Sequence, residues 1–305
     1  MKYTGIHAPA VTPFNDDYSI DVDGFKEVLQ KLLKAGVDGI VIGGTTGEYY
    51  ALSKEERILT WKIAKEVVGK KAFLTLGIGA LRTEDAISLG LEAKKIGADA
   101  VLLGSPYYAM PDEDELIYHL TTIDANIDMP IVLYNFPDRV GVNMTKTVLD
   151  AVCRSGNVIA IKESSGDINR LHMVARDYPH IQLCCGMDDQ ALEFFAWGAT
   201  SWICAASNFL PKEHIALYKA CVEEKNFDKG REIMSAMMPL MQILEQGGKF
   251  VQCIKYGNKL KGIPAGEVRK PLRKLRKEKD LIRTLTEVIG RVEENVAIAI
   301  EKYKK

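Results

Sequence analysis

The chain has 305 residues, 47% of them hydrophobic, which is enough to bury a large core in one α/β domain or in one domain with an appendage. Its 40 basic residues nearly cancel its 41 acidic ones, and the net charge of -1 excludes a general attraction to nucleic acid or to anionic membranes. No apolar run approaches the ~20 residues of a membrane span. The six cysteines form no C-x-x-C pair and the five histidines show no metal-ligand spacing, so we expect a reduced, cytoplasmic protein without a metal.

Short apolar runs recur along the first three quarters of the chain, and each is followed by a helical pattern. They lie at residues 8–11, 39–42, 73–76, 101–103, 131–134, 158–161, 181–184 and 202–205. The runs are continuously apolar and do not alternate, which is typical of strands covered on both faces in a parallel sheet. Eight such β-then-α units in roughly 225 residues predict an α/β fold, a (β/α)8 TIM barrel, over residues 1–225.

The predicted helix starts agree with this phasing. Ser53 opens a capping box with Glu56, acidic residues follow Pro111 in a first turn, and Pro211 suits the first turn of the last barrel helix. Residues 226–305 carry helical patterns without strands and predict a helical C-terminal appendage. Its basic stretch, residues 269–279, is interpreted as a solvated face because no aromatic residues interleave with the charges.

Active sites of TIM barrels lie at the carboxyl ends of the strands, so residues there are the first candidates. Lys162 directly follows the apolar run 158–161. Burial disfavours its ammonium form, and a pKa lowered from ~10.4 to ~7–8 would leave free amine at neutral pH. Such an amine can attack a ketone and form an iminium, which acts as an electron sink. Taken alone, Lys162 also fits a lysine that extends from a strand end into solvent.

Three further strand ends carry polar or glycine-rich segments. The loop of residues 43–48 combines glycines with Thr45 and Thr46, and its N–H groups and hydroxyls would suit a small carboxylate, although a plain turn fits as well. Tyr134 could move protons and Arg139 could hold a second carboxylate, or the two could be a core tyrosine and a surface arginine. Tyr107 and Tyr108 suit either a subunit contact or a hydroxyl relay.

Together these segments resemble one family, the dihydrodipicolinate synthase / N-acetylneuraminate lyase superfamily. The resemblance covers nearly the whole chain and is most specific at residues 44–48, 134–137 and 161–163. It implies that Lys162 forms the Schiff base and that Tyr134 relays protons. It also implies that Thr45 and Thr46 meet the carboxylate of a 2-oxo acid.

The same resemblance implies further site residues. It implies a hydroxyl relay of Thr45, Tyr108 and Tyr134, in which the residue at Tyr108 comes from a neighbouring subunit of a homotetramer. Gly186 and Ile203 match backbone positions that line the site, and Gly44 belongs to the carboxylate loop. The partners are then a small 2-oxo acid and an aldehyde, and no cofactor is needed because the lysine imine is the electron sink.

Arg139 favours one reaction within this superfamily, the condensation of pyruvate with aspartate semialdehyde, because the synthases carry an arginine there for the carboxylate of the aldehyde. Alternatives with the same lysine stay open: a keto-deoxy sugar-acid aldolase or dehydratase, an N-acetylneuraminate lyase-like enzyme, and a deaminase of a hydroxyproline-derived pyrroline carboxylate. An alternative of another class is a non-catalytic barrel that senses a 2-oxo acid. Tyr49, Tyr50 and the segment 186–190 depart from the commonest synthases.

The resemblance also bears on regulation by lysine. Tyr107 is present, but Leu81 stands where lysine-sensitive synthases have asparagine, Asp85 replaces a glutamate, and Tyr50 fills a small-residue position. We expect inhibition by lysine to be weak or absent.

Overall fold

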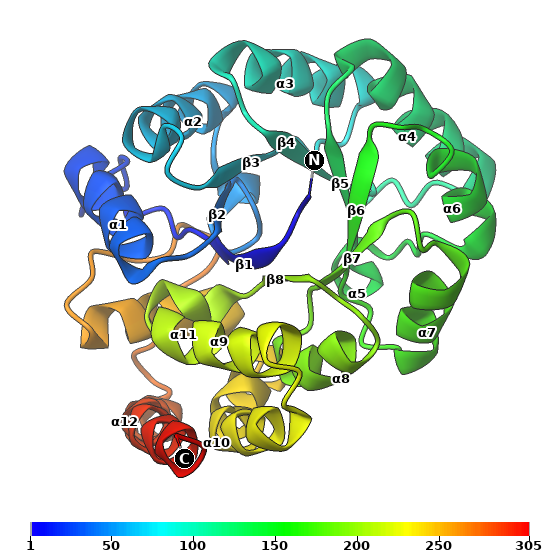
Figure 1. Cartoon of the computed structure of the whole chain (residues 1–305). Helices are drawn as coiled ribbons and strands as arrows, with labels where there is room; N and C mark the ends of the chain where they lie inside the picture. The colour runs from blue at the N-terminus through cyan, green and yellow to red at the C-terminus, as the bar shows by residue number, and fades with distance from the viewer. Residues whose placement is uncertain (1, 305) are drawn as a thin grey trace.

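The computed structural model describes residues 2–304, in which eight parallel strands close into a barrel as β8 pairs with β1. The strands are β1 (Gly5–Pro9), β2 (Gly39–Ile42), β3 (Phe73–Gly77), β4 (Ala100–Gly104), β5 (Ile131–Asn135), β6 (Val158–Glu163), β7 (Gln182–Cys185) and β8 (Ser201–Ile203). Figure 1 looks along the barrel and shows the helices arranged outside the strands. The predicted TIM barrel is confirmed.

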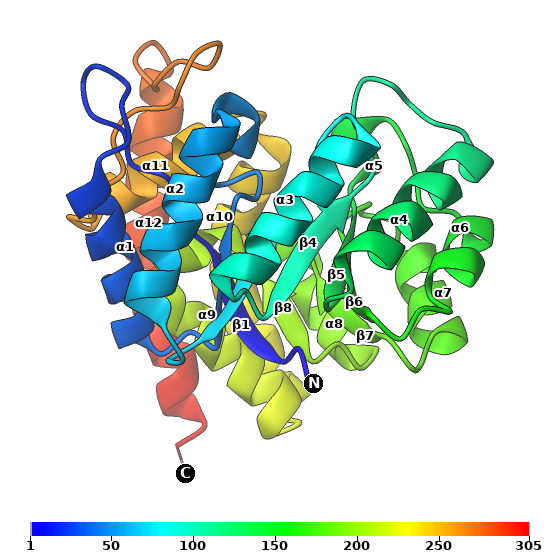
Figure 2. The ribbon, with the colours of Figure 1, turned by 90° about the horizontal axis from the view of Figure 1, so that it is seen from above.

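Helices alternate with the strands around the barrel. They are α1 (Val22–Ala35), α2 (Lys54–Val68), α3 (Thr83–Ile96), α4 (Glu113–Ile127), α5 (Pro137–Val140), α6 (Lys146–Val152), α7 (Ile168–Asp177), α8 (Ala191–Ala196) and α9 (Pro211–Tyr218). Short turns of 3-10 helix, η1 (Tyr49–Ala51), η2 (Asp188–Gln190) and η3 (Ala205–Asn208), follow β2, β7 and β8, and a π-helical turn, η4 (Lys219–Glu223), continues α9. Figure 2 shows the short helix α5 and the N-terminus at opposite ends of the barrel.

The helix starts form as their capping residues predict. The Ser53 hydroxyl accepts from the backbone N–H of Glu56 at 3.2 Å, and the Glu56 carboxylate accepts from the N–H of Ser53 at 2.9 Å. A second reciprocal cap joins Asp112 and Glu115 at the start of α4, with both bonds at 2.9 Å. Pro211 is the first residue of α9. These contacts satisfy N–H groups that the first turn of a helix leaves without partners.

Two strands end earlier than the apolar runs predict. The first strand ends before Val11, because the N–H of Val11 donates to the Asn208 side chain at 3.1 Å and so leaves the sheet. The last strand ends before Ala205, whose N–H donates to the Asp188 carboxylate at 3.1 Å as the chain enters η3. In both places a side chain replaces the neighbouring strand as hydrogen-bond partner.

Three helices follow the barrel: α10 (Phe227–Gln246), α11 (Phe250–Leu260) and α12 (Lys279–Lys302). Helix α10 packs on α8, α9 and α12 (Figure 1). In the basic stretch, Arg269 departs from the predicted solvated face, because its guanidinium forms hydrogen bonds of 2.7 and 2.6 Å to the Glu56 carboxylate at the start of α2. None of the helices in residues 2–304 combines the length and apolarity needed to cross a lipid bilayer.

The core has two layers, one between strands and helices and one inside the barrel. The interior layer consists of Tyr3, Val41, Ala100, Leu102, Val132, Ala160, Cys184 and Ile203, with Phe73, Tyr134 and Ile159 packed against it. Side chains alternate along a strand, so Lys162, two residues after the interior Ala160, also points into the barrel. The fold therefore places this lysine at the carboxyl end of the barrel interior.

Candidate active site

Lys162 and Tyr134 lie side by side inside the barrel. They are register partners on β6 and β5, and the Nζ atom of Lys162 lies 4.2 Å from the centre of the Tyr134 ring. A phenol hydroxyl and an amine on adjacent strands can exchange protons, and rigid strands hold them better than loops would. The structure thus brings together the two residues predicted to form the imine and to move its protons.

A buried polar cluster behind these strands fixes their relative position. Glu163 follows Lys162 and is 1% exposed, and its carboxylate accepts from the Asn135 side chain at 3.1 and 3.0 Å and from the Arg170 guanidinium at 3.2 Å. Asn135 follows Tyr134 in β5, so the two outward-facing neighbours of the reactive pair are hydrogen-bonded to each other. Such partners restrict the side chains of a site to one arrangement.

The loop after β2 is held from the C-terminal region. Glu48 has a left-handed backbone (φ 55°) and is fully buried. Its carboxylate lies 2.6 Å from the Lys255 ammonium and accepts from the N–H of Arg269 at 2.9 Å. The N–H of Glu48 donates to the Thr45 carbonyl at 3.0 Å, which closes the loop on itself. This anchoring holds Thr45 and Thr46 against the barrel mouth.

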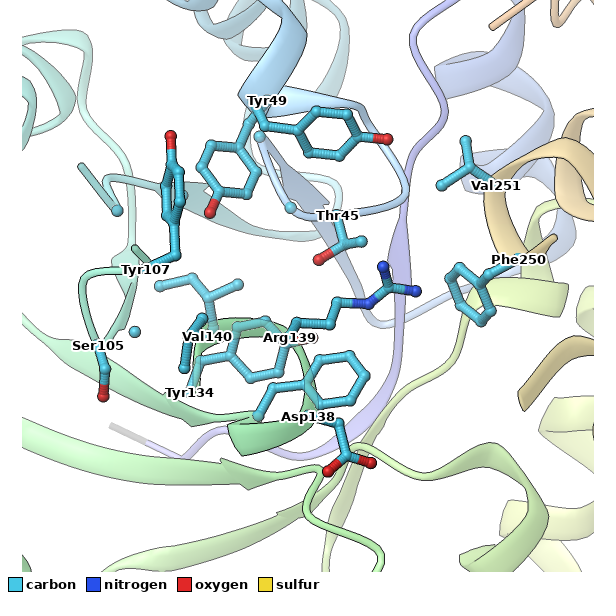
Figure 3. Close-up of a pocket in the computed structure, with 18 of the residues that line it drawn as sticks. Thr45, Tyr49, Ser105, Tyr107, Tyr134, Asp138, Arg139, Val140, Phe250 and Val251 are labelled. Carbon is cyan, nitrogen blue, oxygen red and sulfur yellow. The ribbon is translucent and has the colours of Figure 1, made fainter. Parts of the chain in front are cut away.

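Two adjoining cavities lie at this end of the barrel. The inner cavity has a volume of about 30 Å³, and among its lining residues are Gly44, Thr45, Thr46, Tyr134, Arg139, Lys162, Gly186, Asp188, Ile203, Glu245 and Phe250. The outer cavity has a volume of about 520 Å³, and its lining includes Gly44, Thr45, Tyr49, Tyr50, Tyr107, Tyr134, Phe136, Arg139, Phe250 and Leu272 (Figure 3). Gly44, Thr45, Tyr134 and Arg139 are among the residues that line both cavities, so the two cavities adjoin.

Glycines leave room for a ligand and for close packing in the inner cavity. A Cβ atom at Gly44 would meet no heavy atom within 4 Å, so the missing side chain opens space beside Thr45. At Gly186 a Cβ atom would lie 2.0 Å from the Ser164 hydroxyl and 2.8 Å from the Cγ atom of Lys162. Gly186 is therefore required for the close approach of the β7 end to the lysine.

Arg139 extends into the cavities from α5. Its guanidinium carbon lies 5.3 Å from the centre of the Phe136 ring and 5.7 Å from that of Phe250. Figure 3 shows the guanidinium directed toward Phe250 and Val251. Among residues 2–304, no carboxylate lies within 4 Å of this guanidinium. It can therefore offer its paired N–H groups to an anionic ligand.

Tyr108 is the one predicted site residue that a single chain leaves outside both cavities. It is 90% exposed and has a left-handed backbone (φ 67°), as has Met110 (φ 48°), which is 60% exposed. Its neighbour Tyr107 lines the outer cavity instead. The relay role of Tyr108 stays a prediction, because it requires the residue to enter the site of a second subunit.

The pKa of Lys162 moves in the opposite direction to the one expected. Burial lowers it, but the negative charges that Tyr134, Cys184 and Asp188 carry when ionised raise it by more, so the pKa lies above its ordinary value. The predicted lowering of the pKa is wrong. Burial raises the pKa of the Cys184 thiol to about 11, so at neutral pH Asp188 is the anion that acts on the lysine.

Sequence reasoning assigned no role in the site to Asp188, Glu245 or Phe250, which also line the inner cavity. Asp188 is 2% exposed, and its carboxylate accepts from the Trp202 indole N–H at 2.8 Å. Its place soon after β7 was a usable signal, because it follows a strand end. Glu245 and Phe250 belong to the helices after the barrel, where no strand-end rule applies.

The acids do not assemble into a metal site. Within the described part of the chain, no three side chains of His, Cys, Asp or Glu converge as potential ligands.

Comparisons with known proteins give similar sequences and a similar fold. The sequence profile of the dihydrodipicolinate synthetase family matches residues 2–287. The 4-hydroxy-tetrahydrodipicolinate synthase of Methanocaldococcus jannaschii is 34% identical, over 90% of this chain and 94% of that protein. An uncharacterized DapA-like lyase of Thermococcus onnurineus is 32% identical, over 90% of this chain and 98% of that protein. The solved structure of the 4-hydroxy-tetrahydrodipicolinate synthase of Methylacidiphilum fumariolicum SolV has a TM-score of 0.93 at 32% identity, covering 98% and 99% of the two chains.

Proposed function

Because the chain belongs to the dihydrodipicolinate synthetase family, we propose that it condenses pyruvate with aspartate semialdehyde through an imine on Lys162. The observation that carries the proposal is the pairing of Lys162 with Tyr134 inside the barrel, 4.2 Å from nitrogen to ring centre, in a cavity that also holds Thr45, Thr46 and Arg139. A family of aldolase-type lyases accounts for this set of residues better than a binding barrel does, since a sensor of 2-oxo acids has no need of the lysine and the tyrosine.

The proposed reaction begins with the 2-oxo acid. Its carboxylate binds at Thr45 and Thr46, and the amine of Lys162 attacks the ketone carbon to give a carbinolamine. Because the pKa of Lys162 lies above its ordinary value, the ammonium form first gives one proton to solvent, and the neutral amine then attacks. Tyr134 relays a proton from the nitrogen of the adduct to its oxygen, which gives the carbinolamine hydroxyl, and return of the proton lost first lets this hydroxyl leave as water and the iminium form.

The second half uses the iminium as the electron sink. Loss of a methyl proton gives an enamine, and its carbon attacks the aldehyde carbon of the second substrate while the aldehyde oxygen takes a proton. The carboxylate of this substrate is held by the paired N–H groups of Arg139. Water then attacks the iminium carbon and releases the product from Lys162, after which the product cyclises. The lysine supplies the electron sink, so the proposal includes no organic cofactor.

The exposed loop around Tyr108 supports assembly into a homotetramer as part of the proposal. Tyr108 and Met110 expose large side chains two residues apart in the loop after β4, as residues at a subunit contact do. Sedimentation analysis should then give a mass of four chains, and a monomer would exclude the relay through Tyr108 of a second subunit.

Turnover tests the proposed substrates. With pyruvate and aspartate semialdehyde, the chain should consume pyruvate, and Lys162→Ala should not. The matched control is Lys212→Ala, which removes an exposed lysine and should behave as the unaltered chain. If the protein forms the pyruvate imine but shows no turnover, imine formation on Lys162 stands and aspartate semialdehyde is excluded as the second substrate.

A second candidate keeps the imine and changes the acceptor. The outer cavity, at about 520 Å³, is large for a four-carbon aldehyde and falls in the range of sites for larger ligands. Tyr49 and Tyr50, where the commonest synthases have small residues, contribute its aromatic wall. This cavity favours a longer substrate such as a keto-deoxy sugar acid, and release of pyruvate from such an acid in the presence of Lys162 is the corresponding assay. Release of ammonia from a pyrroline carboxylate would identify the deaminase instead.

A further inference from the structure

The end of α10 brings an additional carboxyl group into the inner cavity. Glu245 is the second-last residue of α10, and it lines this cavity together with Lys162 and Asp188. Its Oε1 atom accepts from the backbone N–H of Asp188 at 3.3 Å. The C-terminal helices therefore contribute directly to the surroundings of the reactive lysine, and none of the roles described above uses Glu245.

The two neighbouring carboxyl groups differ in how well a negative charge is stabilised. The Asp188 carboxylate accepts from the Trp202 indole at 2.8 Å and from the N–H of Ala205 at 3.1 Å. Within residues 2–304, the Glu245 carboxylate has the Asp188 N–H as its one hydrogen-bond donor. Burial, and then the negative charge of Asp188, raise the pKa of Glu245 to about 8, whereas burial raises that of Asp188 to about 6. At neutral pH the charge thus resides on Asp188 and the proton on Glu245.

The charged and titratable groups around Glu245 determine the net charge of the inner cavity when a substrate is bound. Asp188 and Asp189 face it from η2, and Lys162 faces it from β6. Arg139 and Tyr134 line the same cavity from α5 and β5. Ionisation of Glu245 would add a negative charge to a confined space that must also take the carboxylate of the substrate. Like charges in such a space repel strongly, because little water screens them.

We infer that Glu245 enters the inner cavity as a neutral carboxylic acid beside an ionised Asp188, and that this neutral state lets the cavity accept an anionic 2-oxo acid. The inference rests on the proposed function, since it takes the pyruvate imine as the occupant. Glu245 then acts through the charge of the cavity and not on the reacting atoms. Its ionisation at alkaline pH lowers the affinity for pyruvate.

The test compares pyruvate binding at different pH values in the unaltered chain and in Glu245→Gln. Imine formation is measured by borohydride reduction and mass spectrometry over a pyruvate titration, at intervals from pH 6 to pH 10. The amide cannot ionise, so the two proteins should bind pyruvate alike near pH 6. Above about pH 8, the apparent dissociation constant of the unaltered chain should rise relative to the variant by up to about tenfold per pH unit, the limit for one proton. Glu193→Gln, which alters an exposed carboxylate on α8, should follow the unaltered chain.

A second measurement needs no variant and applies even if Glu245→Gln fails to fold. Conversion of a lysine ammonium into an iminium leaves the charge unchanged, so it takes up no net proton. Calorimetry of pyruvate binding near pH 9, in buffers of different ionisation enthalpy, should therefore show uptake of close to one proton per site. Binding without proton uptake overturns the inference.

The outcomes separate the inference from the proposed function. An adduct at pH 7 with the same pH dependence in the unaltered chain and in Glu245→Gln overturns the inference alone. Absence of an adduct at every pH overturns the proposed function and the inference with it. A selective loss of pyruvate affinity in the unaltered chain above pH 8, abolished by the amide, supports both.

Discussion

The Nζ atom of Lys162 lies 4.2 Å from the centre of the Tyr134 ring, and the two residues are register partners on adjacent strands. Their neighbours Glu163 and Asn135 are hydrogen-bonded to each other behind the barrel wall. The relative position of the amine and the phenol is thus set by the sheet and needs no loop movement. Proton transfer between a nucleophile and its relay depends on such a fixed geometry.

The first prediction concerns the hydroxyl of Tyr134. Tyr134→Phe keeps the ring that packs in the barrel interior and removes the group that moves protons. We expect the rate of imine formation to fall by about 10²–10⁴-fold, the usual contribution of a positioned acid or base. Rapid-mixing kinetics with pyruvate measures it, and Tyr118→Phe, at a tyrosine that is 68% exposed, is the control. An unchanged rate in Tyr134→Phe would assign the relay to another residue.

The second prediction separates the two substrates. Arg139→Ala removes a guanidinium that has no carboxylate partner in the described chain and that lines both cavities. Hydrogen bonds to charged groups contribute about 1.5–3 kcal/mol, so kcat/KM for an anionic aldehyde should fall by about 10- to 150-fold. The affinity for pyruvate should change little. Arg154→Ala, at an exposed arginine, is the control, and equal losses for both substrates in Arg139→Ala would contradict the assigned role.

The sequence predicts the fold and those site residues that lie in the strands or at their ends. The barrel follows from eight continuous apolar runs, and Lys162 and Tyr134 follow from the rule that strand ends carry the site. The sequence does not predict Glu245 as a site residue, because it lies on a helix and reaches the cavity only through the packing of α10 against η2. The direction of the Lys162 pKa escaped for the same reason, since it depends on charges that the fold brings near the lysine.

The third prediction concerns the buried ion pair that anchors the loop after β2. Lys255 is 4% exposed and lies 2.6 Å from the fully buried Glu48 carboxylate. Lys255→Met leaves this carboxylate buried without a cation, so the free energy of unfolding should fall by about 3–5 kcal/mol. Urea denaturation measures the change, and Lys259→Met, at an exposed lysine on the same helix, should cost less than about 0.5 kcal/mol.

The double variant Lys255→Met with Glu48→Gln adds a check on this interpretation. Because it removes both charges, it should be destabilised by less than the sum of the two single variants. Additive losses would show that the two side chains act through other contacts.

The fourth prediction concerns regulation. In comparison with lysine-sensitive members of the superfamily, Leu81, Asp85 and Tyr50 replace the residues expected at the regulatory site. Millimolar lysine should therefore leave the activity nearly unchanged, in an assay run beside a lysine-sensitive synthase. Half-inhibition at a sub-millimolar concentration would show that lysine binds despite these replacements.

The central claim is that Lys162 forms the imine, and borohydride reduction in the presence of pyruvate tests it most directly. The account predicts a single pyruvate-derived adduct per chain, on the peptide that contains Lys162, and no adduct in Lys162→Ala. An adduct on another lysine, or a folded chain that forms none, would contradict it.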